Sequence, residues 1–195
     1  MMYERLRARL DDDPGVVPRA LSQAAVLIAL ENSGPEPAVV LTQRAAHLQL
    51  HAGEVAFPGG KCDPGDCDHW ATALREATEE VALPASLVER LGVMPPVVTR
   101  SQIEVTPCVG RLTGAVDLVP NRDELDAVFK VPLSFFAQAG ELHFDRFDYG
   151  GRERLVPRYE WRDYSIWGIT AALLVQLVNL ALDAGLDLEA YWEGR

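Results

Sequence analysis

Hydrophobic and polar positions follow two periods along this 195-residue chain, and the periods predict its strands and helices. Short runs that are continuously apolar, or that alternate apolar with polar residues, have the length of β-strands. These runs cover residues 24–30, 38–42, 54–57, 92–99, 104–112, 127–131, 142–149 and 154–161. Turn-forming residues at 32–37 predict a hairpin of the first two strands, and Gly150 with Gly151 predicts a hairpin of the last two.

Helical spacing of apolar residues occurs in three segments, at residues 3–10, 70–83 and 166–182. Asp68 is the candidate N-cap of the middle helix, and Pro84 stands beyond its end. Strands outnumber helices and do not alternate with them regularly, which favours an α+β fold over a doubly wound parallel sheet. Three aromatic residues, Trp161, Tyr164 and Trp167, are expected to pack the last helix against the sheet.

No internal repeat, low-complexity run or linker divides the sequence. We therefore expect a single domain over residues 1–195, with an N-terminal extension at 1–20 and a C-terminal helix at 165–183. The longest apolar stretch, residues 169–182, is interrupted by polar side chains and falls short of the roughly 20 residues that cross a membrane. No export signal is visible near the N-terminus, so a cytoplasmic protein is expected.

Acidic residues exceed basic residues by 29 to 18, which gives a formal net charge of −11. This balance provides no diffuse basic surface for nucleic acid or anionic lipid, so a small molecule is the expected partner. Net charge leaves open whether two chains pair as a homodimer. The three cysteines, Cys62, Cys67 and Cys108, do not form the pattern of a disulfide framework and indicate a reducing compartment.

Three acidic residues share one face of the middle helix. At about 100° per residue, Glu76, Glu79 and Glu80 fall side by side, next to the apolar face. A solvated surface is the ordinary role of such residues. However, like charges four residues apart destabilise a helix by about 0.2–0.5 kcal/mol, and a hard cation such as Mg²⁺ would relieve that repulsion. Arg75 precedes Glu79 by one helical turn and can orient its carboxylate.

A glycine-rich segment, residues 59–66, leads into this helix. Such segments suit phosphate groups, because backbone N–H groups point at the ligand. The Lys and Ser or Thr that a Walker A loop requires after its last glycine are missing. A tight turn that needs glycine for a positive φ angle is an equally weighted alternative.

Residues 60–83 resemble the Nudix box, a loop, helix and loop that carries the pattern Arg-Glu, two residues, Glu-Glu. Arg75, Glu76, Glu79 and Glu80 match this pattern without a shift. The resemblance therefore includes every acidic residue that the helical wheel places on one face.

Other features are similar to the coenzyme A pyrophosphatase subfamily of Nudix proteins. Asp66 stands where the box usually has Glu, the spacing from Asp66 to Arg75 is one residue longer, and residues 72–77 read Thr-Ala-Leu-Arg-Glu-Ala. Further similar positions are found at residues 41–44, 48, 51, 53–60, 121, 124, 128–129, 131–133 and 166–171. The resemblance implies a Nudix α/β/α sandwich with a mixed β-sheet.

The resemblance also implies hydrolysis of the diphosphate of coenzyme A, its oxidised form or its acyl esters, with Mg²⁺ or Mn²⁺ as cofactor. The implied metal ligands are Glu76, Glu80 and Glu79 with the Gly60 carbonyl. Glu79 and Glu124 are the candidate general bases, although Glu124 can equally be a solvated loop acid, and Arg75 is expected to hold Glu79. Alternatives are a Nudix hydrolase of ADP-ribose, dinucleotides or nucleoside triphosphates, and a ligand-binding Nudix domain without catalysis.

Basic residues near the expected cleft are candidate contacts for the substrate. Arg44, Lys61 and Arg100 can each bind a phosphate or be a plain surface charge. His51 belongs to the similar segments, although a lone histidine is more often structural. Ala82 stands where the box normally has Gly. In the left-handed conformation Ala costs on the order of 1 kcal/mol or shifts the helix end, and we expect activity to survive.

Overall fold

An eight-stranded mixed sheet forms the centre of the structure, a computed structural model that describes residues 1–15, 21–32, 34–149 and 152–189. The helices are α1 (Met2–Arg9), α2 (His69–Val81), α3 (Leu133–Phe136) and α4 (Gly168–Leu182), with short 3-10 turns η1 (Ala85–Leu87) and η2 (Ala139–Glu141). The strands are β1 (Ser22–Glu31), β2 (Ala38–Arg44), β3 (Val55–Ala56), β4 (Gly59–Lys61), β5 (Val88–Val93), β6 (Val97–Val98), β7 (Ile103–Leu112), β8 (Leu125–Pro132), β9 (His143–Tyr149), β10 (Arg152–Trp161) and β11 (Tyr164–Trp167).

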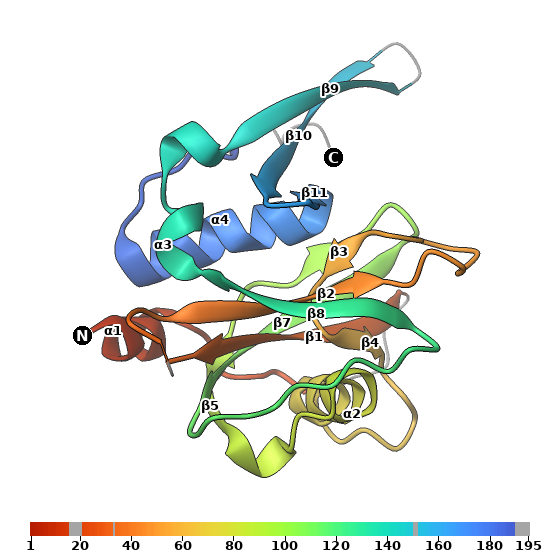
Figure 1. Ribbon diagram of the computed structural model, residues 1–195, viewed down its shortest axis with the longest axis vertical. Coiled ribbons are helices and arrows are strands. Elements are labelled where there is room, and N and C mark those ends of the chain that lie inside the picture. Colours follow the sequence, from red (N-terminus) through yellow and green to blue (C-terminus); the bar gives the residue numbers. More distant parts are fainter. Residues whose placement is uncertain (16–20, 33, 150–151, 190–195) are drawn as a thin grey trace.

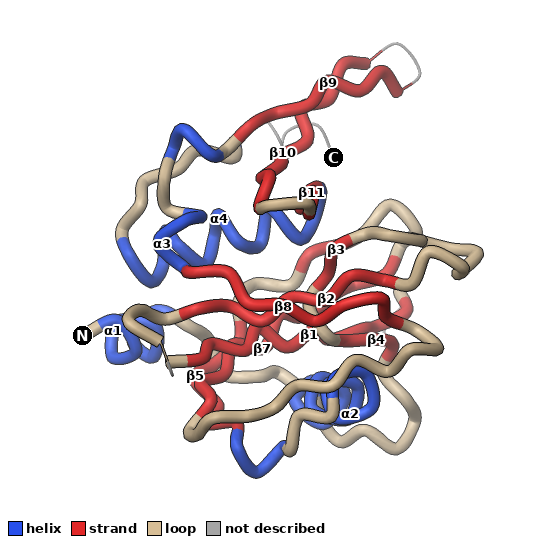
Figure 2. Tube along the Cα trace, viewed as in Figure 1, coloured by secondary structure: helices blue, strands red, loops and turns tan. Residues whose placement is uncertain are grey.

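Strand β1 is the hub of the large sheet, whose central order is β3-β2-β1-β7-β5. It runs parallel to β7 and antiparallel to β2 and β4. Helix α2 covers one face of this sheet and α4 covers the other (Figures 1 and 2). The predicted α+β sandwich with a mixed sheet is therefore confirmed.

Strand β1 is buried on both faces, and this explains the unbroken apolar run at residues 24–30. Ala24, Ile28 and Leu30 belong to the core on the α4 side, whereas Leu27 and Ala29 belong to the core on the α2 side. Alternate residues of a strand point to opposite faces, so a strand between two helical layers needs apolar residues at every position.

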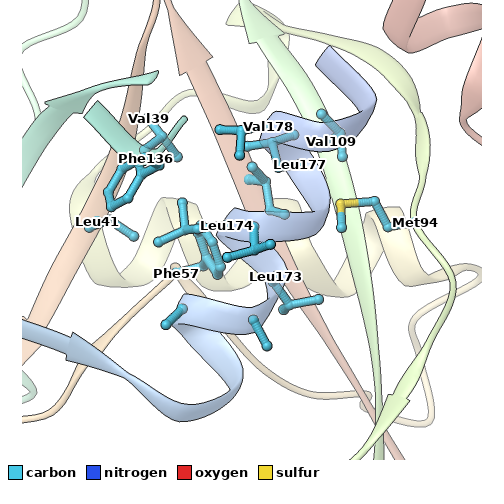
Figure 3. Packing of buried hydrophobic residues seen from close by; sticks show 14 of the residues in the cluster. Val39, Leu41, Phe57, Met94, Val109, Phe136, Leu173, Leu174, Leu177 and Val178 are labelled. Carbon is cyan, nitrogen blue, oxygen red and sulfur yellow. The ribbon is translucent and has the colours of Figure 1, made fainter. Parts of the chain in front are cut away.

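Helix α4 fills the larger core. Leu173, Leu174, Leu177 and Val178 lie among side chains from the sheet and from α3, as Figure 3 shows. Their exposed fractions are 1% or less. Helix α1 lies beside α4 (Figure 1) and is joined to it by hydrogen bonds from Arg5 and Arg9. None of the helices in the described ranges is long and apolar enough to span a membrane.

Helix α2 begins as predicted, because Asp68 accepts a hydrogen bond from the N–H of Ala71 at 2.6 Å and so caps the helix. The predicted strand at residues 92–99 is divided in the structure. It separates into β5 and β6, since Pro95 and Pro96 stand between them and have no N–H to donate.

The last part of the chain departs from the prediction. Strands β9 and β10 pair as expected, with Tyr149 opposite Arg152, while the predicted turn at Gly150 and Gly151 lies outside the described residues. The C-terminal helix was expected at residues 165–183, with helical periodicity over 166–182. In the structure it begins only at Gly168. Residues before it form β11, which pairs with β10 from Tyr164 to Trp167.

The expected packing role of the three aromatic residues is correct for two of them. Trp161 lies edge-on against Phe135 of α3, with ring centroids 4.7 Å apart, and Tyr164 stacks on Phe129 of β8 at 3.8 Å. Both belong to the margin of the α4 core. Trp167 does not pack there, because 42% of its surface is exposed.

Candidate active site

Two glycines of β4 allow the acidic face of α2 to lie close to the large sheet. Gly59 and Gly60 belong to β4, which pairs with β1 through Val26 and Ala25. A Cβ atom at Gly59 would lie 2.4 Å from the carbonyl oxygen of Ala25, and one at Gly60 would lie 2.4 Å from Glu76 Oε1. Neither glycine has a positive φ angle. The alternative of a tight turn is therefore wrong, and glycine is needed here for space.

The three carboxylates of α2 differ in exposure. Glu80 is 4% exposed, whereas the side chains of Glu76 and Glu79 are 17% and 60% exposed. Glu80 accepts a hydrogen bond from the Gly59 N–H at 3.0 Å. Burial raises the pKa of Glu80 to about 7. The charges of Glu76 and Glu124 add to this rise, while the Gly59 hydrogen bond and Arg44 oppose it.

The exposure of Glu76 is intermediate between that of Glu80, which is buried, and that of Glu79, which is exposed. Its Oε1 accepts a hydrogen bond from Arg75 Nη1 at 2.8 Å. Burial raises the pKa of Glu76, and the charges of Glu79 and Glu124 act in the same direction against the opposing effect of Arg75. Burial and the neighbouring carboxylates together therefore outweigh the effect of Arg75 on Glu76.

Arg75 is held chiefly by Asp66, a partner that the sequence analysis did not assign. Arg75 Nε and Nη2 donate to the two oxygens of Asp66 at 3.3 and 3.0 Å, and Nη2 also donates to the Lys61 carbonyl at 3.1 Å. The expected pair with Glu79 exists, but at 3.6 Å it is the looser contact. The signal for Asp66 was its place in the box, where the general pattern has Glu.

Hydrogen bonds and charge hold Asp66 in its ionised form. The Arg75 guanidinium, the Asp63 N–H and the Thr72 hydroxyl lower the pKa of Asp66 to about 2, against the effect of burial. Asp66 thus joins the glycine-rich loop to the helix that carries the carboxylates.

Arg44 and Glu124 approach the carboxylates from neighbouring segments. Arg44 ends β2, where the register with β8 shifts, and the N–H of Ala45 donates to the Glu124 carbonyl at 2.8 Å. The charge of Glu124 raises the pKa of both Glu76 and Glu80, and Arg44 lowers that of Glu80. Within the described residues, the buried Nε of Arg44 has no hydrogen-bond partner.

The other predicted substrate contacts have exposed side chains. Lys61 pairs with Ala24 and its side chain is exposed. Arg100 is exposed in the turn before β7, at the end of the sheet where Ser22 pairs with Ile103. His51 is exposed and hydrogen bonds to Glu54 at 2.9 Å.

Ala82 itself adopts the left-handed conformation, with φ 54° and ψ 31°, so the end of α2 is not shifted. The N–H of Ala82 donates to Thr78 and the N–H of Leu83 donates to Ala77. These bonds satisfy the last carbonyls of the helix in the way that a C-terminal glycine usually does.

The N-terminal end of α2 has a second, unpredicted partner. Asp13 accepts hydrogen bonds from His69 Nδ1 at 2.6 Å, from the Trp70 N–H at 3.2 Å and from the Gly15 N–H at 2.8 Å. The side chains of His69 and Asp13 are 1% and 9% exposed. This contact links the segment after α1 to the helix that carries the site.

The donor set suits a hard divalent cation. In the described residues, no three carboxylate, histidine or cysteine groups are already arranged so that they could hold a metal ion. Yet Glu76 and Glu80 each have one oxygen bound to a protein donor, which leaves the other oxygen available, and Glu79 is mostly exposed. Glu76 and Glu80 are neighbouring carboxylates with raised pKa values, and a dication would stabilise their ionised forms.

Comparison with known proteins agrees with this geometry. Residues 21–145 match the family model described as the NUDIX domain. Proteins of Salmonella newport and Salmonella enteritidis, each named uncharacterized Nudix hydrolase NudL, are 44% identical over 156 residues, which is 80% of this chain and 80% of each relative.

Among solved structures, a MutT/nudix family protein from Enterococcus faecalis matches with a TM-score of 0.55 and 16% identity. The match covers 86% of this chain and 64% of that one, and at this identity it shows the fold alone. The family model spans more than half of the chain, and the NudL relatives match over most of their own length. The chain therefore belongs to the Nudix hydrolase family.

Proposed function

We propose that the protein hydrolyses the diphosphate linkage of coenzyme A to 3′,5′-ADP and 4′-phosphopantetheine, with Mg²⁺ or Mn²⁺. The observation that carries the hydrolytic proposal is the cluster of Glu76, Glu79 and Glu80, with Glu80 buried and its pKa raised to about 7. Coenzyme A as substrate is supported by the subfamily features in residues 41–171, which lie on both sides of the carboxylates in sequence.

The proposed metal ligands are Glu76, Glu80 and Glu79, together with the Gly60 carbonyl. A dication bound there would neutralise the phosphates, polarise phosphorus and lower the pKa of a bound water. Arg75 positions Glu76 through a 2.8 Å hydrogen bond and is itself fixed by Asp66. Replacement of Glu76 or Glu80 by Gln should therefore reduce both metal binding and turnover by a hundredfold or more.

Arg44 is the best supported of the four proposed substrate contacts. Its guanidinium acts electrostatically on Glu80, and its Nε lacks a partner in the described structure. An unpartnered buried donor is costly, and a phosphate oxygen would satisfy it. Lys61 and Arg100 share one end of the sheet and can meet more distant phosphates, whereas the exposed His51 is already bonded to Glu54.

The general base is proposed to be Glu79 or Glu124, since both side chains are exposed and belong to the acidic cluster. We expect Glu124→Gln to lower kcat more than tenfold if Glu124 takes the proton from the attacking water. Asp123→Asn is the matched control, because it removes a neighbouring exposed carboxylate from the same loop. A loss below tenfold in Glu124→Gln, or an equal loss in the control, excludes Glu124 as the base and leaves Glu79 as the candidate.

The decisive experiment is product analysis after coenzyme A is incubated with the protein and Mn²⁺. Formation of 3′,5′-ADP and 4′-phosphopantetheine, and its loss in Glu80→Gln, is the expected result. Parallel assays with ADP-ribose, a dinucleoside polyphosphate and a nucleoside triphosphate identify a different Nudix substrate if one of them is turned over faster. If none of these compounds is hydrolysed, the catalytic proposal is wrong and a ligand-binding role replaces it.

A further inference from the structure

A β-bulge lies at the start of β8, where this strand pairs with the end of β2; the two strands lie side by side in Figure 1. Gln43 lies opposite Ala127, but the next residue of β2, Arg44, lies opposite Leu125. Asp126 is therefore an extra residue of β8 at this point. A bulge bends its strand and re-aims the side chains around it, and bulges are frequent beside active sites.

The side chain of Asp126 closes the bulge. Its Oδ2 accepts a hydrogen bond from the N–H of Ala46 at 2.9 Å, just after β2 ends. The adjacent N–H of Ala45 donates to the Glu124 carbonyl at 2.8 Å. The chain that follows Arg44 is thus held to β8 by two consecutive N–H groups. Of these two bonds, the one to Asp126 depends on a side chain and can be removed by substitution.

The bulge is joined to the helix that carries the carboxylates. The Asn121 N–H donates to the Glu80 carbonyl at 2.8 Å, and the Glu124 N–H donates to the Asn121 carbonyl at 3.0 Å. One short turn therefore connects Glu124 to α2. The charges of Glu124 and Arg44 both act on the Glu80 carboxylate, and they change its pKa in opposite directions. Both charged groups beside the bulge thus belong to the candidate site.

We propose that Asp126 is a positioning residue, which directs Arg44 and Glu124 towards the carboxylates of α2 by closing the bulge. The inference rests on the proposed function for the roles of Arg44 as a phosphate contact and Glu124 as a candidate base. Asp126 is exposed and acts through these two neighbours. Its partner is a neutral N–H group, so the position requires an acceptor oxygen and not a charge.

The test compares Asp126→Ala and Asp126→Leu, which remove the acceptor, with Asp126→Asn, which keeps an oxygen for the Ala46 N–H. Asp123→Ala is the matched control, because it removes an exposed carboxylate from the loop before β8. The first readout is the Nε–H signal of Arg44 in the NMR spectrum, assigned by its loss in Arg44→Lys. The second is kcat/KM for coenzyme A with Mn²⁺, and the thermal midpoint of each variant verifies that it is folded.

Asp126→Ala and Asp126→Leu should shift the Arg44 signal and lower kcat/KM by about tenfold, equal to about 1.4 kcal/mol. Asp126→Asn and Asp123→Ala should leave the signal in place and kcat/KM within about twofold of the parent protein. An unchanged signal in a folded variant without the acceptor overturns the inference. An unchanged kcat/KM there, while the parent cleaves coenzyme A, does the same.

A loss in Asp126→Asn equal to that in Asp126→Ala would mean that charge and not the hydrogen bond matters, and it would also overturn the inference. An equal loss in Asp123→Ala would lead to the same conclusion. If the Arg44 signal shifts as expected but the parent protein does not cleave coenzyme A, the positioning role stands and only the proposed function fails.

Discussion

Ala82 holds the left-handed conformation at the end of α2, at φ 54°, although a Cβ atom disfavours it. Ala82→Gly should therefore raise the free energy of unfolding by about 1 kcal/mol, or a few degrees in thermal midpoint. Ala71→Gly is the matched control, because the same change inside α2 should destabilise the protein. Thermal unfolding of both variants measures the difference, and a destabilised Ala82→Gly would contradict it.

Catalysis should depend little on the same residue, since Ala82 preserves the helix end. Turnover of Ala82→Gly is expected to remain within a hundredfold of the parent protein. An increase of a hundredfold or more would show that alanine distorts the carboxylates of the preceding turn.

The contact of Asp66 with Arg75 makes the free energy of unfolding depend on pH in the acid range. Its folded-state pKa of about 2 lies below the ordinary value of 3.8, so the unfolded chain takes up the proton first as pH falls. The contribution is complete above about pH 4 and is lost toward pH 2, and it amounts to about 1–2 kcal/mol. Urea unfolding should show Asp66→Asn less stable than the parent at pH 6, with the gap closing below pH 4.

The control for this prediction is Asp63→Asn, whose carboxylate is 66% exposed and 3.7 Å from Arg75. It should change stability by less than 0.5 kcal/mol, as expected for an exposed pair. A gap between Asp66→Asn and the parent that is the same at every pH would mean that the amide loses a contact unrelated to charge.

Individual site residues were predictable where a helical period placed them together. Glu76, Glu79 and Glu80 follow from the spacing on a helix, but their unequal burial does not, because it depends on how closely β4 approaches α2. Helical spacing alone also did not identify the main partner of Arg75. A spacing of four pointed to Glu79, whereas the fold of the glycine-rich loop brings Asp66 closer.

At the scale of elements, the N-terminal end of α2 depends on Asp13. Asp13→Ala removes the acceptor for His69 Nδ1 and the Trp70 N–H and leaves both buried groups unpaired. We expect a loss of about 3 kcal/mol, as when one partner of a buried pair is removed. Urea unfolding measures it, with Asp12→Ala as control because that neighbour is exposed. Equal effects of the two changes would exclude a role for the buried contact.

Elements whose apolar residues recur with one clear period were predictable from the sequence. Elements that are defined by pairing between distant segments were not. The strands β1, β2, β7 and the helix α2 lie close to their predicted positions, since their patterns reflect burial on one or two faces. The start of α4 was misplaced because residues 166–167 are apolar and fit a helix equally well. Pairing with β10 makes them a strand, and the positive φ of Gly168, 66°, ends it.

For the whole molecule, a dication bound to the carboxylates should stabilise the folded state, because the unfolded chain does not hold them together. At a free Mn²⁺ concentration 100 times Kd the gain is about 2.7 kcal/mol, or roughly 5–10 °C in thermal midpoint. Excess chelator should reverse it. In the double variant Glu76→Gln and Glu80→Gln, Mn²⁺ should produce no shift, and a shift of parental size there would place the metal elsewhere.

The parallel pairing of β1 with β7, from Ser22 and Ile103 onward, affects how the site matures during synthesis. The ribosome releases every carboxylate of α2 before it releases β7, so the new chain has its ligands before β1 has a neighbour on that side. Parallel pairing over such a separation closes late. A nascent chain that stops before residue 103 would therefore carry the whole Nudix box beside an incomplete sheet, and we expect it to bind the proposed dication more weakly than the finished protein does.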